Sequence, residues 1–393
     1  MSLQPRFMVY FPMLFMATFW GLMKVGLPIF PTMPNLLNTS EDTVRLIISL
    51  SFIFGGLSPL FWGPLIDKMQ MKRFIEMVCV VGSVALVLAS FASNIIFFGI
   101  LFVVASAFVS GLSVCSRAFP VTYMKDPEQV KHALSLTSFG GYSAAFLTPL
   151  LSGWVSTWFG WRAVFLIIPI WLVALFFIVR SLPTQSKASS AITFKQSLKQ
   201  MAAHFKNDVF RKALIVVMCM AAIIQSYYIA VPFWLTPVYH IHPNEVAYYL
   251  LPTLLPGIIY PPFSNYMIQK LGERFIVKSV KVCFILAAIS AFALSFLGNT
   301  ISWFWLIPGF LATLYSVALI PILLFHTFNT IDEGKSSASG LIGVATYVSG
   351  GIGMLITVYI NLHNFYWEGV FILVASLVSF WALKGVVKLP AEQ

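Results

Sequence analysis

Long apolar runs separated by short polar turns make up almost the whole chain. Each run holds about twenty predominantly apolar residues, which is the length that an α-helix needs to cross the hydrocarbon core of a bilayer. The pattern predicts twelve transmembrane helices, at Phe7–Phe30, Thr43–Ile66, Phe74–Ser93, Ile96–Phe119, Ala133–Thr157, Trp161–Leu182, Ala213–Tyr239, Val246–Ile268, Phe275–Leu297, Ile301–Phe328, Ser337–Leu362 and Phe365–Val387. We therefore expect an all-α membrane protein.

The loops between the runs differ in charge from one to the next. The turn between the second and third runs carries Lys68, Lys72 and Arg73 with one acid, Asp67. Nearly all other lysines and arginines fall on alternate loops of the same side, and basic residues favour the cytoplasmic face of a membrane. The sequence therefore predicts a multi-pass protein of the cell inner (plasma) membrane with both termini in the cytoplasm.

One long polar segment, Pro183–Lys212, lies between the sixth and seventh runs. It divides the chain into residues 1–182, predicted as an N-terminal six-helix bundle, and residues 213–393, predicted as a C-terminal one. Inside the linker, Phe194, Leu198, Met201, Ala202 and Phe205 recur at helical spacing, which predicts an amphipathic helix lying on the inner leaflet. A partly disordered connector is the alternative interpretation.

The two halves repeat short patterns at a nearly constant offset. Asp67–Gln70 corresponds to Gln269–Gly272, and Pro59 corresponds to Pro261, at a shift of about 202 positions. Matches of this kind indicate two parallel repeats. We expect the twelve helices to form two pseudo-symmetric six-helix bundles, an arrangement typical of secondary transporters.

Composition excludes several other classes of protein. The chain is 59% hydrophobic and 9% charged, whereas a soluble domain has about 25% charged residues. The net charge of +11 comes from short loops between apolar runs, so it indicates membrane orientation and no nucleic-acid partner. The four cysteines lie inside apolar runs at no metal-like spacing, and we expect no metal, disulfide or cofactor.

Several motifs in this order resemble one transporter family. They are Leu27–Pro34 followed by Ser40–Arg45, Gly63–Asp67 with Lys72 and Arg73, Thr148–Gly153 followed by Gly160–Phe165, and Gly334–Leu341. On these motifs the chain is identified as a member of the major facilitator superfamily, in the twelve-span drug:proton antiporter group (Bcr/CflA-like). Two positions depart from the family: Phe102 stands where helix four carries a membrane arginine, and Leu27 stands where helix one carries an acid.

The resemblance implies a set of gating residues. Gly63, Asp67, Lys72 and Arg73 match the loop whose acid helps to close the inner mouth, with Ser336 or Ser337 as its partner, and Arg117 completes that network. The alternative is a solvated loop acid and an arginine that extends to the membrane surface. Pro149 and Gly153 match the helix-five motif, where proline and a small residue allow bending and close approach.

Lys24 lies inside the first predicted helix, where a charge is costly and usually faces a water-filled cavity. We expect it to attract an anionic group of the substrate. The alternative is a lysine that extends to the outer interface. Other candidate substrate-binding residues are polar or aromatic positions in the spans: Trp20, Tyr142, Gln225, Tyr227, Tyr228 and Tyr347.

His326 is the one histidine within a predicted span, and its side chain titrates near neutral pH. It is therefore the candidate for proton coupling. A hydrogen-bonded packing histidine is the alternative.

These observations predict a secondary transporter of an organic small molecule, and the resemblance implies proton-coupled efflux by alternating access, as in multidrug-resistance antiporters. No catalytic grouping stands out and no nucleotide-binding motif is present, so we expect neither an enzyme nor an ATPase. The alternatives are a transporter of an anionic metabolite such as a carboxylate siderophore, in either direction, and a membrane-embedded sensor. The expected partners are the substrate, H+ and lipid, and the expected state is a monomer.

Overall fold

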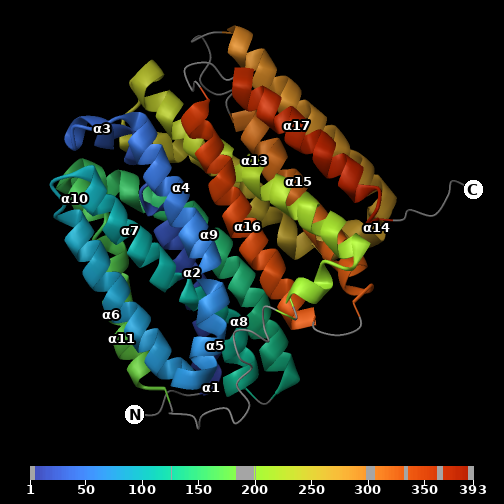
Figure 1. The fold of residues 1–393 in the computed structure, drawn as a ribbon, viewed down its shortest axis with the longest axis horizontal. Helices are drawn as coiled ribbons and strands as arrows, with labels where there is room; N and C mark the ends of the chain where they lie inside the picture. Colours follow the sequence, from blue (N-terminus) through green and yellow to red (C-terminus); the bar gives the residue numbers. More distant parts are fainter. Residues whose placement is uncertain are drawn as a thin grey trace, which may run out of the picture. The chain divides into compact units, whose positions relative to one another are not determined.

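The computed structural model describes residues 5–124, 126–182, 199, 201–297, 306–331, 335–360 and 366–387. Within these ranges the regular structure is helical, with no strand, and Figure 1 shows the helices in chain order. The prediction of an all-α protein is confirmed for the described residues.

The helices of the first half are α1 (Pro5–Met8), α2 (Phe11–Val25), the 3-10 turn η1 (Phe30–Thr32), α3 (Met33–Leu36), α4 (Glu41–Leu57), α5 (Pro59–Met69), α6 (Met71–Ser90), α7 (Ile95–Val109), α8 (Gly111–Tyr123), α9 (Pro127–Phe159), α10 (Trp161–Val164) and α11 (Ile167–Arg180). Those of the second half are α13 (Asp208–Tyr239), α14 (Pro243–Leu297), α15 (Leu306–Phe328), α16 (Lys335–Tyr359) and α17 (Tyr366–Leu383).

Among the described residues, 11 helical segments are long and apolar enough to cross a membrane. They correspond to the predicted runs except the fifth, which forms α9. This helix has 33 residues, or a length of about 50 Å, so it also exceeds the thickness of a bilayer. Polar and small residues are spread along this helix, among them Ser135, Thr137, Gly140 and Thr148, and they lower its mean hydropathy relative to the other spans.

Polar side chains fix where several spans begin. Asn94 accepts a hydrogen bond from the backbone N–H of Phe97 (2.8 Å) at the start of α7. Asn207 does the same for Phe210 (3.1 Å) at the start of α13. Each side chain satisfies a backbone donor that has no partner within its own helix, so each marks a helix start in an otherwise apolar sequence.

Contacts divide the chain into two compact units. The first unit comprises Met1–Phe194 with His242–Ala247, and the second comprises Lys195–Ile241 with Tyr248–Gln393. In the first unit, α2 packs against α8, α9 and α11; in the second, α13 packs against α15, α16 and α17. In the numbering of the predicted spans these are the same pairings, the first helix of each half against the fourth, fifth and sixth.

Glycine lets the first and fifth spans of each unit approach backbone to backbone. A Cβ atom built on Gly140 of α9 would collide with the carbonyl of Met13 on α2, whose carbonyl carbon would lie 3.0 Å away. In the second unit, a Cβ atom on Gly353 of α16 would lie 2.7 Å from Ala222 Cα on α13 and would also collide with the Ala222 carbonyl oxygen. Both crossings therefore require a residue without a side chain.

The turns between the second and third spans of each half share an unusual backbone conformation. Gln70, between α5 and α6, has φ 76° and ψ 126°. Gly272, inside the continuous segment α14, has φ 76° and ψ 151°. The two residues are the ones paired by the offset of about 202 positions in the sequence. Glycine adopts this region freely, whereas a residue with a Cβ atom is strained there.

Exchanging the residue types in these two turns is expected to change stability in opposite directions. Gln70→Gly relieves the strain of a side chain at positive φ and should stabilise the protein by about 1 kcal/mol. Gly272→Ala introduces that strain and should destabilise it by a similar amount. Thermal unfolding of the two purified variants in detergent measures both shifts, and shifts of the same sign would contradict the account.

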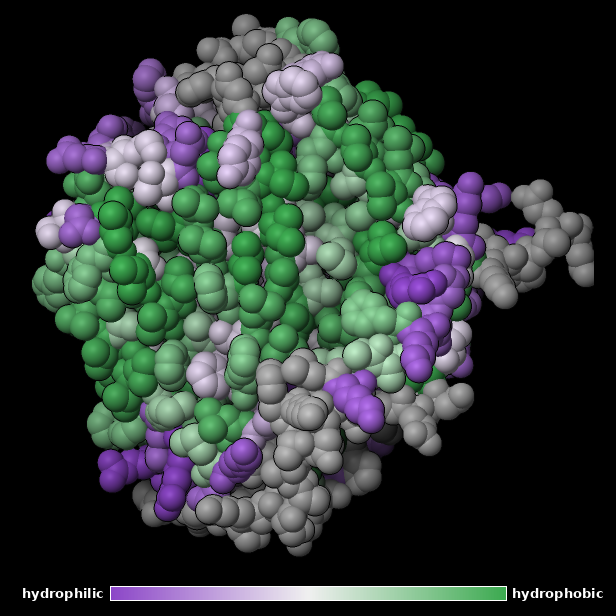
Figure 2. Space-filling model, in the orientation of Figure 1, coloured by the Kyte–Doolittle hydropathy of each residue, from purple (hydrophilic) through white to green (hydrophobic). Residues whose placement is uncertain are grey.

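Exposed side chains on the spans are largely apolar. Figure 2 shows hydrophobic residues along the middle of the helices and hydrophilic residues gathered near helix ends. The exposed apolar residues include Phe61, Ile96, Ile100, Ile170, Phe177 and Trp381. Such a surface suits contact with lipid tails and would be unfavourable in water.

Candidate functional site

Lys24 lies one residue before the end of α2, and its side chain is buried, with 1% of its surface exposed. The ammonium Nζ lies 5.9 Å from the ring centroid of Trp20 and 5.6 Å from that of Phe52 on α4. Both distances are within the range of cation–π attraction, which stabilises a cation in a poorly hydrated place. The first unit thus holds a buried lysine beside two aromatic faces.

The surroundings of α2 explain how Trp20 is positioned. A Cβ atom on Gly141 of α9 would lie 2.9 Å from Trp20 Cδ1, so the indole occupies the space that a side chain would need. Six residues before Lys24 on the same helix, Thr18 accepts a hydrogen bond from Trp171 Nε1 of α11 at 2.7 Å. Helix α2 is therefore tied to α9 by close packing and to α11 by a polar contact. Tyr142, the next candidate along α9, is half-buried.

Phe102 lies in an aromatic cluster of the first unit. It is the position at which the family that the sequence resembles carries an arginine. Its ring centroid is 5.5 Å from that of Phe98, 5.9 Å from Phe30 and 6.0 Å from Phe165. All four rings are buried. The Phe102 ring is therefore packed among three other aromatic rings, which are apolar surroundings for a guanidinium.

The second unit holds the other four predicted binding residues, and all are buried: Gln225, Tyr227 and Tyr228 on α13 and Tyr347 on α16. The Tyr228 hydroxyl lies 3.2 Å from Thr313 Oγ1 on α15. The Tyr227 ring packs on Gly309, where an added Cβ atom would lie 2.7 Å from Tyr227 Cδ1. A Cβ atom on Gly350 of α16 would lie 2.9 Å from Gln225 Cγ. The structure therefore brings these α13 residues against α15 and α16.

A buried carboxyl that the sequence did not single out lies in the same unit. Glu368, in the first turn of α17, has no exposed surface. Ser226 Oγ of α13 lies 2.8 Å from Glu368 Oε1 and donates a hydrogen bond to it. The sequence places Glu368 at the outer end of the last span, where an acid is ordinarily solvated. Its burial depends on α13, which packs along α17 and is distant in the sequence.

His326, the predicted coupling histidine, lies near the end of α15 and is paired with an acid. Its Nε2 atom lies 2.9 Å from Glu273 Oε2 on α14, and the exposed fractions of the two side chains are 26% and 35%. His326 is therefore hydrogen-bonded to an acid of a neighbouring helix, with both side chains partly exposed. Its role in coupling stays a prediction.

The predicted gating residues lie around the turn from α5 to α6. Lys72 Nζ donates to the backbone carbonyls of Arg180 (2.8 Å) and Leu182 (2.7 Å), so it caps the C-terminal end of α11. Arg73 on α6 and Arg117 on α8 are exposed. Gly63 lies in α5, where an added Cβ atom would meet no neighbour.

The partners proposed for Asp67 can be located only in part. Asp67 lies in the last turn of α5, but its side chain and that of Ser336 lie outside the described residues. Ser337, near the start of α16, has its hydroxyl 2.8 Å from His204 Nε2. The latch between Asp67 and the start of helix eleven stays a prediction.

The linker is described only near its C-terminal end. Residues 201–204 are helical, Met201 is half-buried, and Ala202 and Phe205 are exposed. Phe194 and Leu198 lie outside the described residues. His204 therefore joins this part of the linker to α16 through Ser337, and the amphipathic helix stays a prediction.

The helix-five residues lie on α9. Pro149 is inside the helix. A Cβ atom on Gly153 would lie 2.8 Å from the Cα atom of Asn244, which belongs to the segment assigned to the same unit. Gly153 therefore lies where another backbone comes close, and the role of the motif stays a prediction.

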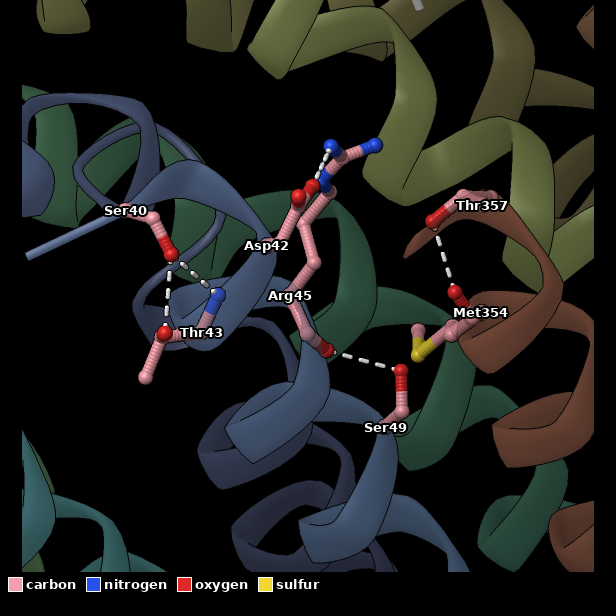
Figure 3. A network of polar contacts seen from close by, with 7 residues as sticks. All are labelled: Ser40, Asp42, Thr43, Arg45, Ser49, Met354 and Thr357. Atoms are coloured by element: carbon pink, nitrogen blue, oxygen red, sulfur yellow. Dashed lines mark hydrogen bonds and ion pairs between the residues drawn. The ribbon is translucent and has the colours of Figure 1, made fainter. Parts of the chain in front are cut away.

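Figure 3 shows the start of α4, where Ser40–Arg45, one of the motifs on which the family resemblance rests, forms a capping network. Ser40 Oγ accepts a hydrogen bond from the backbone N–H of Thr43 at 3.2 Å. Asp42 forms an ion pair with Arg45, whose backbone carbonyl accepts from Ser49 Oγ at 2.7 Å. The motif therefore fixes the start of the second span.

Metal sites were not expected from the sequence. Among the described residues, no group of three or more His, Cys, Asp or Glu side chains could hold a metal ion.

The sequence profile of the Major Facilitator Superfamily matches residues 13–349. The chain is 25% identical over 185 residues to the quinolone resistance protein NorB of Staphylococcus aureus (strain JH9), a match that covers 45% of this chain. The chain spans 38% of that relative's length in the match.

Solved structures with the same fold are much more distant in sequence. A bacterial homolog of the human lysosomal transporter Spinster, in an inward-facing and occupied conformation, superposes with a TM-score of 0.75 at 14% identity, covering 99% of this chain and 100% of that one. The nucleoside transporter NupG superposes with a TM-score of 0.73 at 15% identity, covering 98% and 100%. At these identities the likeness supports the fold alone.

Proposed function

The chain belongs to the Major Facilitator Superfamily, and from this premise we propose that it exports an organic anion with aromatic bulk in exchange for protons. Members of this superfamily carry small molecules through the membrane. The proposal adds three things to that statement: the direction of transport, the coupling ion and the charge of the substrate.

Buried Lys24 is the observation that carries the proposal. Holding an ammonium group inside a membrane span is costly, so such a residue usually has a functional partner. In a medium of low dielectric constant a cation attracts an anionic group strongly. Trp20 and Phe52, which flank the ammonium, offer faces on which an aromatic substrate can stack.

A quinolone antibiotic has the chemistry that this site favours. Quinolones are planar aromatic compounds that bear a carboxylate, and norfloxacin also bears a basic amine. The carboxylate is the group that suits Lys24, and the ring suits Trp20. The similarity to NorB, whose name is quinolone resistance protein, supports the same class of substrate and the outward direction. Norfloxacin is therefore the first probe to test.

Neutralising Lys24 is expected to impair norfloxacin transport. In proteoliposomes with an imposed pH gradient, Lys24→Gln should lower the initial rate at low substrate concentration about tenfold or more, because a lost charge–charge contact is worth at least about 1.4 kcal/mol. Lys24→Arg keeps the charge and should retain more transport. Lys206→Gln, which removes an exposed lysine of the linker, is the matched control.

A cationic probe separates a charge effect from a general loss of function. Ethidium transport, if the wild type supports it, should not fall in Lys24→Gln. Full norfloxacin transport by Lys24→Gln would overturn the role of Lys24. Absence of norfloxacin transport by the wild type would overturn the quinolone proposal.

The same cation suits a carboxylate-rich siderophore, which is the second candidate substrate. Competition of norfloxacin transport by a polycarboxylate, and not by a neutral aromatic compound, would favour this class. The direction of a siderophore carrier would then be read from which orientation of the pH gradient drives its movement.

We further propose that the protein lies in the plasma membrane as a monomer with both termini in the cytoplasm. The distribution of lysine and arginine over alternate loops supports this orientation. Asp67, Arg73 and Arg117 are proposed to close the cytoplasmic side, and the pair of His326 with Glu273 stays one candidate for coupling.

A further inference from the structure

Glu368 is a fully buried carboxyl in the last span, and its surroundings are unusual for an acid near a helix start. Ordinarily such an acid is exposed, or it bonds the backbone at its own helix end. Here Oε1 accepts from Ser226 of α13, and Oε2 is buried without a hydrogen-bond partner among the described residues. The carboxyl is therefore directed at a neighbouring helix and has hydrogen-bonding capacity to spare.

Ser226 provides a partner for both protonation states of Glu368. Its Oγ atom lies 2.8 Å from Glu368 Oε1 and 2.9 Å from the backbone carbonyl of Ile223. One hydroxyl hydrogen cannot form a full-strength hydrogen bond to both acceptors at once. When Glu368 is ionised, the hydroxyl donates to the carboxylate; when Glu368 is protonated, its own O–H donates to Ser226, and the hydroxyl donates to Ile223.

The environment acts on the two protonation states of Glu368 in opposite directions. Complete burial favours the neutral acid, because an ionised carboxylate loses more hydration. The start of α17 and the Ser226 hydroxyl favour the ionised form. Opposing effects of this kind suit a group that repeatedly gains and loses a proton.

Among the described residues, few other charged groups lie near Glu368 on the helices around it. On α13 the nearest titratable side chain is buried Tyr227, and Asp208, Arg211 and Lys212 lie at least 14 residues away in the sequence, about 21 Å along the helix. On α14, Phe292 packs against Gly369, and the charged residue nearest to Phe292 along that helix, Lys281, is about 16 Å away. On α15, the Tyr315 hydroxyl is hydrogen-bonded to Ser379, which lies about 16 Å from Glu368 along α17. His363 precedes α17 outside the described residues.

We propose that Glu368 is the carboxyl that takes up and releases the coupling proton, with Ser226 as its exchangeable hydrogen-bond partner. The step is the conversion of carboxylate and H+ to carboxylic acid and its reverse, with no other bond changed. This inference rests on the proposed proton-coupled export, because it names the group that would carry the proton. It competes with His326 for that role.

The transport experiment compares two assays in proteoliposomes with norfloxacin as the probe. Glu368→Gln, which imitates the protonated acid, should lose accumulation driven by a pH gradient, so that the internal concentration falls to the equilibrium value. It should retain exchange of labelled for unlabelled norfloxacin without a gradient, to within about twofold of the wild type, because exchange needs no net proton movement. Glu245→Gln, at an exposed acid of α14, is the matched control.

Two further variants separate coupling from folding. Glu368→Asp keeps the carboxyl and should restore part of the gradient-driven accumulation. Ser226→Ala removes the exchangeable partner and should move the pH dependence of accumulation while exchange persists. Gradient-driven accumulation at the wild-type level in Glu368→Gln would overturn the inference. An equal loss of accumulation and of exchange in a Glu368→Gln protein with the wild-type melting temperature would also overturn it.

A spectroscopic measurement tests Glu368 without any substrate. Infrared difference spectra of the purified protein between alkaline and acidic pH should show the C=O band of a buried protonated carboxyl, and Glu368→Gln should lack it. If Glu368→Gln keeps this C=O band, the inference about Glu368 is overturned, whereas the proposed function is not affected. If the wild type fails to couple norfloxacin to a pH gradient but shows this band, the proposed function fails and the proton site stands.

Discussion

Gly353→Ala is expected to destabilise the second unit by about 1–3 kcal/mol, and Gly353→Val by more. The new Cβ atom would lie 2.7 Å from the Cα atom and 2.8 Å from the carbonyl carbon of Ala222. Backbone atoms cannot rotate away as a flexible side chain can, so α16 and α13 would have to separate. Their separation would weaken the packing along the whole helix pair.

The measurement is the thermal midpoint of the purified protein in detergent, followed by tryptophan fluorescence and by size-exclusion chromatography. Gly340→Ala is the control on the same helix, because its Cβ atom would meet only Met201 Cε at an ordinary 3.7 Å. This control should be neutral or slightly stabilising, since alanine favours helix more than glycine. Equal midpoints for the two variants would contradict the backbone-contact interpretation.

Phe102→Arg, which restores the arginine of the resembled family, is expected to cost about 3 kcal/mol or more and to reduce the yield of folded protein sharply. The guanidinium would enter a cluster of Phe30, Phe98 and Phe165, whose side chains offer it no hydrogen-bond acceptor. A charge buried without an acidic partner is among the most destabilising changes in a protein interior.

Two controls isolate the charge from the change in shape. Phe102→Leu removes the aromatic ring without adding charge and should cost less. Phe97→Arg places the same side chain in the first turn of α7, at a position that is 46% exposed, where it can extend toward the membrane surface. A Phe102→Arg protein as stable as Phe97→Arg would show that the cluster admits a charged partner.

The fold could be predicted from the sequence because hydrophobic length and loop charge act locally. The runs that became α6, α11 and α15 are apolar over the length that a bilayer requires, and no tertiary contact is needed to recognise them. The pairing of Gln70 with Gly272 was also visible, since both halves share a short turn pattern. Its positive φ was not visible, because glutamine gives no sign of a conformation that glycine favours.

The candidate site was predictable only where one residue is unusual by itself. Lys24 stands out as a charge within an apolar run, whatever surrounds it. Glu368 does not stand out in the sequence, because it lies at the end of an apolar run. Its burial comes from the packing of α17 on α13. Lys72 was expected to act in a gate, whereas its observed contacts are with the end of α11, which the sequence could not place beside it.

The glycine crossings at Gly140 and Gly353 constrain how a transport cycle can proceed. Where two backbones touch, no side chains remain that could change rotamer and let the helices slide. The pairs α2 with α9 and α13 with α16 should therefore travel as rigid bodies, and bending must be taken up elsewhere, for example in α14 with its four internal prolines. A disulfide engineered across either crossing would leave turnover intact.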